Sequence, residues 1–206
     1  MKISTMNKQS GVSLMEVLVT MIIILIGLLG IVALQAKAQI AELEAYQRAQ
    51  AMIMLSDIVD QINVNRGTAT CFAITTNTTT GTPFLGGVPG ETGHYGSGTC
   101  TASTSAYNAQ AVSTLDDIDN LLAYGVDSTG VAGMIGARAC ISYDGTDLIN
   151  SRAGTGLYTV IVSWQGMSDL VSPAGLKCAS GTTYYGSENR RRAVGTTFRL
   201  ARLFGG

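Results

Sequence analysis

The chain has 206 residues, 13% of them charged, and a formal net charge of −1. That length suits one domain with a sizeable core plus an additional element, and so small a net charge gives no reason to expect a nucleic acid or a strongly acidic partner. Apolar residues are unevenly distributed, because residues 17–34 carry no charge and one hydroxyl whereas Thr, Gly, Ser, Asn and Ala dominate residues 75–113. One part of the chain is therefore suited to hydrocarbon and another to water.

The first predicted element is a membrane-spanning helix. Residues 17–36 contain no charged side chain, and a helix of about twenty residues rises about 30 Å, the thickness of a hydrocarbon core. Lys2 and Lys8 come before this run and no acid precedes Glu16, so the positive-inside rule places the N-terminus in the cytoplasm and exports the remainder. A cleavable secretory signal is the alternative, but it needs a shorter apolar run and a small-residue cleavage site.

Helical periodicity continues outside the membrane. The pattern predicts one helix from Ser13 to Arg66, ended by Gly67. The outer half of this helix carries one apolar stripe, which we expect the rest of the chain to cover. The stripe consists of Ile40, Leu43, Met52, Ile53, Leu55, Ile58, Val59 and Ile62.

The remainder predicts a small α+β domain. Residues 114–125 have helical spacing, and acids in a first turn favour a helix start. Those acids are Asp116, Asp117 and Asp119. Three later runs predict strands, at residues 134–143, 157–166 and 192–204. An antiparallel sheet laid on the helix stripe is the simplest architecture that buries both.

The four cysteines predict disulfide bonds. Cys71, Cys100, Cys140 and Cys178 are widely spaced, and with a single histidine in the chain they offer no close ligand pair for zinc. On the exported side of a bacterial membrane, disulfides are the natural state. Of the three possible pairings we favour Cys71 with Cys100 and Cys140 with Cys178, because each closes a loop local to one region.

Three other features have ordinary structural explanations. His94 lies in a glycine-rich loop, so we expect a solvated side chain. Arg190, Arg191 and Arg192 begin a terminal strand, where a solvated basic edge that discourages sheet addition is favoured over a site for DNA or an acidic partner. Trp164 is expected in the core or in a half-buried sheet. The sequence offers no catalytic constellation, so we expect no enzyme activity, metal or cofactor.

The start of the chain resembles a processing signal. Lys8, Gly11, Glu16 and the apolar helix that follows resemble the class III signal of type IV prepilins. The resemblance implies that a prepilin peptidase cleaves between Gly11 and Val12 on the cytoplasmic face and methylates Val12. Glu16 would then be the fifth residue of the mature chain.

The resemblance extends further, to minor pilins of the PilV type, often called type IV pilus modification proteins. It is carried by residues 11–66, the segments ARACISY (137–143) and TVIVSWQG (159–166), Cys178, Tyr185-Gly186 and Arg191-Arg192. Two features depart from the usual pattern. Val12 stands where pilins usually have phenylalanine, and the apolar helix lacks the proline of major pilins, which leaves Gly27 and Gly30 as its soft points.

The resemblance implies a type IV pilin-like fold, α+β, with a long N-terminal helix packed on a C-terminal antiparallel sheet. The implied segments are a leader peptide at 1–11, a transmembrane and assembly half of the helix at 12–36, an exported amphipathic half at 37–67 and a periplasmic or pilus globular domain at 68–206. Before assembly the protein would be a single-pass inner-membrane protein with a cytoplasmic N-terminus. After assembly it would be part of a pilus on the cell surface.

The implied function is that of a minor pilin in the initiation or tip complex of type IV pili, and hence in twitching motility and adhesion. Implied partners are the prepilin peptidase, other minor pilins, the major pilin, the inner-membrane assembly platform and a tip-associated adhesin, whereas nucleic acid is not expected. Two alternatives stay open. One is a minor pseudopilin of a type II secretion system, and the other is an adhesin or DNA-binding pilin that displays residues 68–133 at the tip.

Glu16 has a chemical role that follows from its position. After cleavage at Gly11 the new amine lies four residues away, about 6 Å along a helix, near the interface where a charge is cheaper than at the membrane centre. When such helices bundle, Glu16 loses water and needs a cation, which the N-terminal amine of a neighbouring subunit supplies. The alternative is an interfacial glutamate that extends into water and has no role in assembly.

Overall fold

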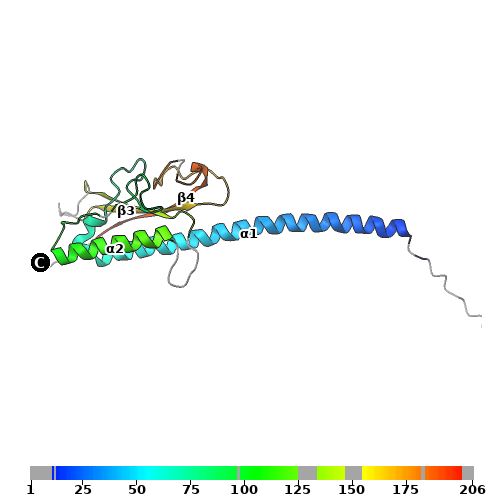
Figure 1. The fold of residues 1–206 in the computed structure, drawn as a ribbon, viewed down its shortest axis with the longest axis horizontal. Coiled ribbons are helices and arrows are strands. Elements are labelled where there is room, and N and C mark those ends of the chain that lie inside the picture. Colours follow the sequence, from blue (N-terminus) through cyan, green and yellow to red (C-terminus); the bar gives the residue numbers. More distant parts are fainter. Residues whose placement is uncertain are drawn as a thin grey trace, which may run out of the picture. The chain divides into compact units, whose positions relative to one another are not determined.

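The computed structural model describes residues 11, 13–96, 98–124, 134–146, 155–181 and 184–200 (Figure 1). The chain divides into two compact units, an N-terminal unit (Met1–Glu42) and a globular unit (Leu43–Gly206). The elements are α1 (Leu14–Val64), η1 (Arg66–Phe72), β1 (Leu85–Gly86), α2 (Ser105–Tyr124), β2 (Arg138–Asp144), β3 (Leu157–Gln165), η3 (Glu188–Arg190) and β4 (Arg191–Arg199).

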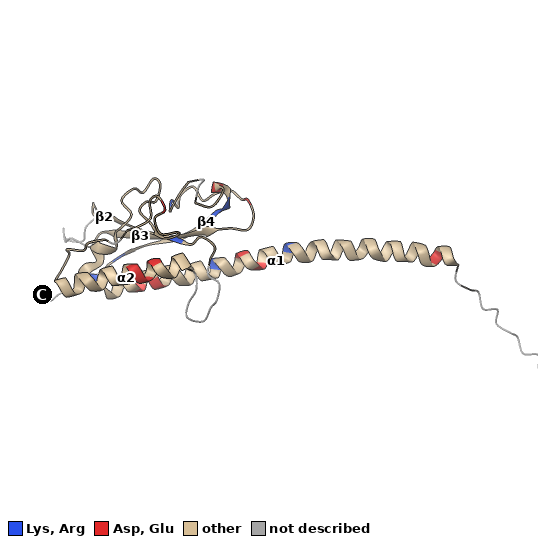
Figure 2. Cartoon of the chain, in the orientation of Figure 1, with Lys and Arg blue, Asp and Glu red and all other residues tan. Residues whose placement is uncertain are grey.

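The N-terminal unit contains the first part of α1. This helix begins at Leu14, one residue after the predicted start, and it continues without a break through Gly27 and Gly30. Within the N-terminal unit, the large apolar side chains of this helix are exposed. By length and composition α1 meets the requirement for a membrane span, and Figure 2 shows an uncharged stretch of it after the acidic residue in its first turn.

The end of α1 differs from the prediction. The helix ends at Val64 and is followed by η1, so that Gly67, predicted as the stop signal, lies inside a 3-10 helix. The main-chain N and the side-chain Nδ2 of Asn65 both donate to the carbonyl of Gln61, at 3.1 and 2.9 Å. An asparagine therefore satisfies a helix-end carbonyl that was expected to need a glycine.

The globular unit is built on a four-stranded antiparallel sheet in the order β1-β2-β3-β4. The three predicted strands are confirmed with shifted ends, since β2 begins at Arg138 and β3 ends at Gln165. The predicted continuation of the last strand over residues 201–204 lies outside the described residues. The two-residue strand β1 was not predicted, because Leu85–Gly86 is too short to show a period. The fold class is α+β, the pilin-like arrangement that was expected.

Each face of the sheet has its own core. On one face Ile141, Val160 and Trp164 pack with apolar residues of α1 and α2. On the other face Cys140 and Ile161 pack with Phe84, Cys178, Ala179 and Tyr185, which come from loops. Successive residues of β3 therefore point into different cores, and the predicted burial of Trp164 is confirmed. In Figure 1 both helices lie on one side of β3 and β4, and the long loops lie on the other.

The buried stripe of α1 is only partly the predicted one. Ile58 and Ile62 are fully buried as expected, but Met52 and Ile53 are exposed, and the small residue Ala51 occupies the core instead. Leu43 is also exposed, as is Ile40, which belongs to the N-terminal unit. The predicted stripe mixed residues from two faces of α1. A pattern of apolar residues does not show where the helix packs so closely that a small side chain such as Ala51 is buried instead of a large one.

Helix α2 is longer than predicted. It begins at Ser105 rather than at residue 114, and buried Ala111 belongs to its extra turns. The prediction that Asp116, Asp117 and Asp119 mark the helix start is therefore wrong, because they lie well inside α2. Residues 105–113 combine three alanines and a glutamine with Ser, Tyr, Asn and Val, so they carry no clear apolar period and periodicity did not identify them. Gly125, the predicted last residue, lies outside the described residues.

Two disulfide bonds hold the globular unit together. Cys71 bonds to Cys100 and Cys140 bonds to Cys178, with Cα–Cα distances of 5.4 and 5.5 Å. These are the two pairs that the sequence favoured. The first bond ties the end of η1 to the loop before α2, and the second ties the sheet to the loop between β3 and β4.

Candidate functional site

The first candidate site is the start of α1. The backbone N–H groups of Glu16 and Val17 both donate to the carbonyl of Ser13, at 2.9 and 3.3 Å, which opens the helix. Glu16 is exposed in the first turn, where a carboxylate interacts favourably with the helix dipole. Gly11 is exposed, and a side chain placed there would meet no atom within 4 Å. Val12, the predicted mature N-terminus, and residues 1–10 of the predicted leader lie outside the described residues.

Residues 17–34 of the apolar run after Glu16 have one polar side-chain group to satisfy. The hydroxyl of Thr20 donates to the carbonyl of Val17 at 2.8 Å, so the helix itself supplies the partner. A hydrogen-bonded hydroxyl costs far less in hydrocarbon than a free one. This arrangement fits both a lipid-facing helix and a helix inside a bundle.

The second candidate site is a polar clamp between α1 and the loop after β3, entirely within the globular unit. Glu44 Oε1 accepts hydrogen bonds from the main-chain N of Met167 at 3.2 Å and from the main-chain N and Oγ of Ser168 at 3.3 and 3.0 Å. Arg192 Nη2 lies 3.3 Å from the same oxygen and donates to the carbonyl of Ser168 at 2.7 Å. Burial raises the pKa of Glu44, but the Ser168 hydrogen bonds and the Arg192 charge outweigh it and hold the pKa below its ordinary value.

Arg192, the last of the three consecutive arginines, belongs to this clamp. The prediction of a solvated edge is wrong for Arg191, which is buried, and for Arg192, which is partly buried, whereas Arg190 is exposed as predicted. Each arginine has a different carboxylate: Arg190 pairs with Asp169, Arg191 with Glu188 and Arg192 with Glu44. Successive residues at a strand start point to opposite faces, so three consecutive arginines cannot share one environment. That rule was the available signal. It could not have identified Asp169 and Glu44, which lie 21 and 148 positions from their arginines, although Glu188 is near Arg191 in the sequence.

Arg191 is the most buried of the three, with no exposed surface. Its Nε donates to Glu188 Oε1 at 2.6 Å and its Nη2 to the carbonyl of Pro173 at 3.1 Å. Burial raises the pKa of Glu188, but hydrogen bonds from Arg191 and Gly181 reverse this and lower the pKa overall. The pair fixes the loop between β3 and β4 from inside.

His94 is also placed differently from the prediction. Its Nε2 lies 3.0 Å from Asp119 Oδ1, and the histidine side chain is only 10% exposed. The same carboxylate oxygen accepts a hydrogen bond from the main-chain N of Gly86 at 2.7 Å. The expected solvated histidine is therefore a structural contact between the segment after β1 and α2.

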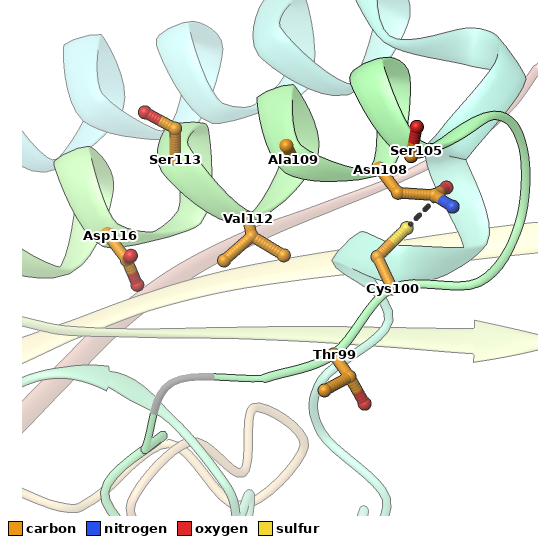
Figure 3. A pocket seen from close by; sticks show the side chains of 8 residues that line it. All are labelled: Thr99, Cys100, Ser105, Asn108, Ala109, Val112, Ser113 and Asp116. Carbon is orange, nitrogen blue, oxygen red and sulfur yellow. Dashed lines mark hydrogen bonds between the residues drawn. The ribbon is translucent and has the colours of Figure 1, made fainter.

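The described part of the chain contains no candidate metal centre. Its residues contain no group of three His, Cys, Asp or Glu side chains that could hold a metal ion. An open groove of about 560 Å³ lies between α2 and the segment that contains Cys100 (Figure 3). The Asn108 side chain in it is engaged with Ser103, accepting from the main-chain N at 2.9 Å and donating to the carbonyl at 2.8 Å. The disulfide-bonded sulfur of Cys100, 3.1 Å from Asn108 Oδ1, is not a nucleophile.

Comparison with known proteins supports the reading of the N-terminus. Residues 6–32 match the family model of the prokaryotic N-terminal methylation motif. Neither the curated proteins nor the solved structures gave a match. The motif and the α+β fold together support a pilin-like protein of a pilus or pseudopilus system. The motif further implies processing by a prepilin peptidase and association with the membrane, in which the apolar part of α1 fits an anchor.

The clamp between α1 and β4 leads to a prediction about acid. Glu44 and Glu188 both have pKa values below 4.5, the ordinary value. The stability that they contribute is thus fully present above about pH 4.5 and is lost as pH falls through their lowered pKa values. We expect Glu44→Gln to lower the free energy of unfolding by about 1–3 kcal/mol at neutral pH and to flatten its decline in acid. Denaturant unfolding across that pH range measures both effects.

The control for this prediction is Glu42→Gln, which removes an exposed carboxylate on the same helix. We expect it to change the free energy of unfolding at neutral pH by less than about 0.5 kcal/mol. Equal losses in the two variants at neutral pH would show that the Glu44 clamp contributes nothing specific.

Proposed function

We propose that the chain is a minor pilin of the PilV type, a structural subunit that helps to start type IV pilus assembly within a tip or priming complex. Twitching motility and adhesion would depend on it through the pili. The observation that carries the proposal is the methylation motif at residues 6–32, which leads into the 51-residue helix α1. The last part of α1 packs into a disulfide-bonded α+β unit, as expected for a subunit rather than for a simple membrane anchor.

Processing is the first step of the proposed function. The peptidase would cleave between Gly11 and Val12 at the cytoplasmic face, and methylation would follow at Val12. The exposure of Gly11 supports access of an enzyme to this bond. The new amine and Glu16 would then lie about one helical turn apart, so that each subunit brings one cation and one anion to the same depth in the membrane.

Assembly is the second step. In a bundle of such helices the exposed apolar surface of α1 would be covered by neighbours, and Glu16 would pair with the N-terminal amine of the next subunit. An unpaired charge in that setting is costly, so this pairing would favour addition in register. The partners would be other minor pilins, the major pilin and the inner-membrane assembly platform. A pseudopilin of a type II secretion system is the second candidate, because the methylation motif serves both systems.

Mass spectrometry of the mature protein tests the processing step. We expect Val12 as a methylated first residue and a formal net charge of −3, since loss of Lys2 and Lys8 takes two positive charges from −1. Gly11→Ala should still be cut, because alanine is small, whereas Gly11→Trp should block cleavage. An intact Met1 on assembled protein would contradict the proposal.

The cellular role is tested by counting surface pili in a deletion strain. We expect the deletion to reduce pili and twitching, and blocking pilus retraction should restore some pili if the protein acts in initiation. Normal pili together with lost protein secretion would instead assign the chain to a pseudopilus.

A further inference from the structure

The two disulfide bonds of the globular unit lie in different surroundings. Cys140 and Cys178 are only 2% and 0% exposed and belong to the core of loop residues on one face of the sheet. Cys71 and Cys100 are partly exposed and pack at the border of the main core. A thiolate that attacks a disulfide bond must reach one of its sulfur atoms. The two bonds therefore differ in the access that thiol–disulfide exchange requires.

Each cysteine of the partly exposed bond borders an open hollow. Cys100 lines the groove of about 560 Å³ along α2, and Ala109 lies on the helix side of the same groove (Figure 3). Cys71 lines a second hollow of about 340 Å³, together with Thr99 and Thr101. A thiol can therefore approach the Cys71–Cys100 bond while the core of the globular unit stays folded.

The segment around Cys100 depends on this bond for its position. Before the segment, the main-chain N of Tyr95 donates to the carbonyl of Phe84 at 2.8 Å, and after it the Asn108 side chain holds the start of α2. Between these points, residues 99–102 make no backbone hydrogen bond to another residue that the structure describes. Opening the bond would thus release a short stretch whose two flanks remain held.

The second disulfide bond is held in place by more than its sulfur atoms. Cys140 lies in β2 and pairs with Ile161 of β3. Next to Cys178, the main-chain N of Ala179 donates to the carbonyl of Gly81 at 2.9 Å. Access to this bond requires the loops to separate from the sheet, which is a larger opening than the release of one irregular segment.

We propose that the Cys71–Cys100 bond is a thiol–disulfide exchange site, which a dithiol reductant opens while the Cys140–Cys178 bond stays closed. A thiolate of the reductant attacks Cys100 Sγ from the groove and forms a mixed disulfide, and the electron pair of the broken bond leaves on Cys71 Sγ, which takes up a proton. The second thiol of the reductant loses its proton and attacks the reductant's own sulfur in the mixed disulfide. Cys100 then leaves as a thiolate and is protonated, so two electrons have passed from the dithiol to the protein.

The globular unit is expected to stay folded after this exchange. Its main core contains Ile58 of α1 and Leu115 and Ile118 of α2, which pack without help from the bond. The segment between Tyr95 and α2 would gain freedom instead. The surface that this segment displays would therefore differ between the oxidised and the reduced protein.

Differential alkylation of the full-length oxidised protein tests the proposal. The protein is incubated in detergent with dithiothreitol, its free thiols are blocked with N-ethylmaleimide at successive times, and its remaining disulfides are reduced in denaturant and labelled with iodoacetamide. We expect maleimide on Cys71 and Cys100 to appear about tenfold or more faster than on Cys140 and Cys178, because the buried bond reacts only after its surroundings open. Equal rates at the two bonds, or faster reaction at the buried one, would overturn the proposal.

The fluorescence of Trp164 shows whether the opening is local. Trp164 is only 3% exposed and belongs to the main core. We expect its emission to stay at short wavelength at times when Cys71 and Cys100 already carry maleimide. An emission shift to longer wavelength in step with this labelling would mean that the unit unfolds, and local exchange would then be wrong.

Two neighbouring variants test the route through the groove. Ala109→Trp places a large ring in the groove and should slow the labelling of Cys71 and Cys100 by roughly threefold or more, since the rate depends on access. Gln110→Trp changes the next residue of α2, which is exposed and does not line the groove, and should leave the rate unchanged. Equal rates in the two variants would contradict attack at Cys100 from the groove.

A parallel series with reduced thioredoxin distinguishes the source of the dithiol. Opening by both reagents would support exchange with protein dithiols as well as small ones. Opening by dithiothreitol alone would support a site that only small thiols enter. A Cys71–Cys100 bond that resists both reagents as long as the Cys140–Cys178 bond does would overturn the exchange site.

Discussion

Replacing Ile58 with aspartate is expected to unfold the globular unit. Ile58 is fully buried in the core shared by α1 and the sheet. Removal of its side chain costs about 2–5 kcal/mol, and burial of a carboxylate in its place adds several kcal/mol more. The sum approaches the total stability of a typical domain, about 5–15 kcal/mol. Thermal unfolding of the purified full-length protein, followed by near-ultraviolet circular dichroism, should show little or no folded signal.

Ile53→Asp is the matched control, because it makes the same chemical change on the same helix at a side chain that is 63% exposed. We expect a change of less than about 0.5 kcal/mol in its free energy of unfolding. The two isoleucines are indistinguishable in the sequence pattern. If both variants unfold equally, the buried face of α1 has been assigned incorrectly.

Replacing Glu16 with alanine is expected to abolish or strongly reduce incorporation into pili without affecting folding. The side chain is exposed and lies in the N-terminal unit, so its removal leaves the core intact. In an assembled bundle the neighbouring amine would lose its partner, at a cost of about 3–5 kcal/mol for a buried charge. That cost is roughly a hundredfold or more in the equilibrium for each contact.

Immunoblots of sheared pili and of membranes measure this effect, with Glu42→Ala as a control for loss of a carboxylate elsewhere on α1. We expect the Glu16→Ala protein to be cleaved and held in the membrane but missing from the pilus fraction. Wild-type amounts of the Glu16→Ala protein in the pilus fraction would contradict the proposed charge pairing. Loss of the protein from the membrane would instead indicate a defect in insertion or stability.

The elements of this fold were predictable where a local pattern repeats over many residues. The long helix, the three longer strands and the burial of Trp164 follow from period and composition. The strand β1 and the early turns of α2 were not predictable in this way, because one is too short to alternate and the other is polar on most sides. Local periodicity identifies an element, but the face that it buries depends on neighbours.

The clamp shows why contacts between elements were harder to predict. Glu44 and Arg192 are 148 positions apart, and nothing near Glu44 distinguishes it from Glu42. His94 looked solvated because its neighbours are glycines, yet Asp119 from α2 meets it. In each case the partner is supplied by the tertiary structure. At the N-terminal site the reverse holds, since Gly11 and Glu16 were selected by the resemblance of the sequence to a prepilin signal, before any packing was considered. Their roles in cleavage and assembly stay predictions.

The connectivity of the two disulfide bonds has a consequence for biogenesis. Each bond joins cysteines that are consecutive along the chain, the first two and the last two. If export delivers the chain from its N-terminal side, Cys71 and Cys100 enter the oxidising compartment together before Cys140 arrives. The native partner is then the only one present at each stage, so oxidation in order of arrival gives the correct bonds. A folding subunit of this kind needs a thiol oxidase and does not depend on slow reshuffling by an isomerase.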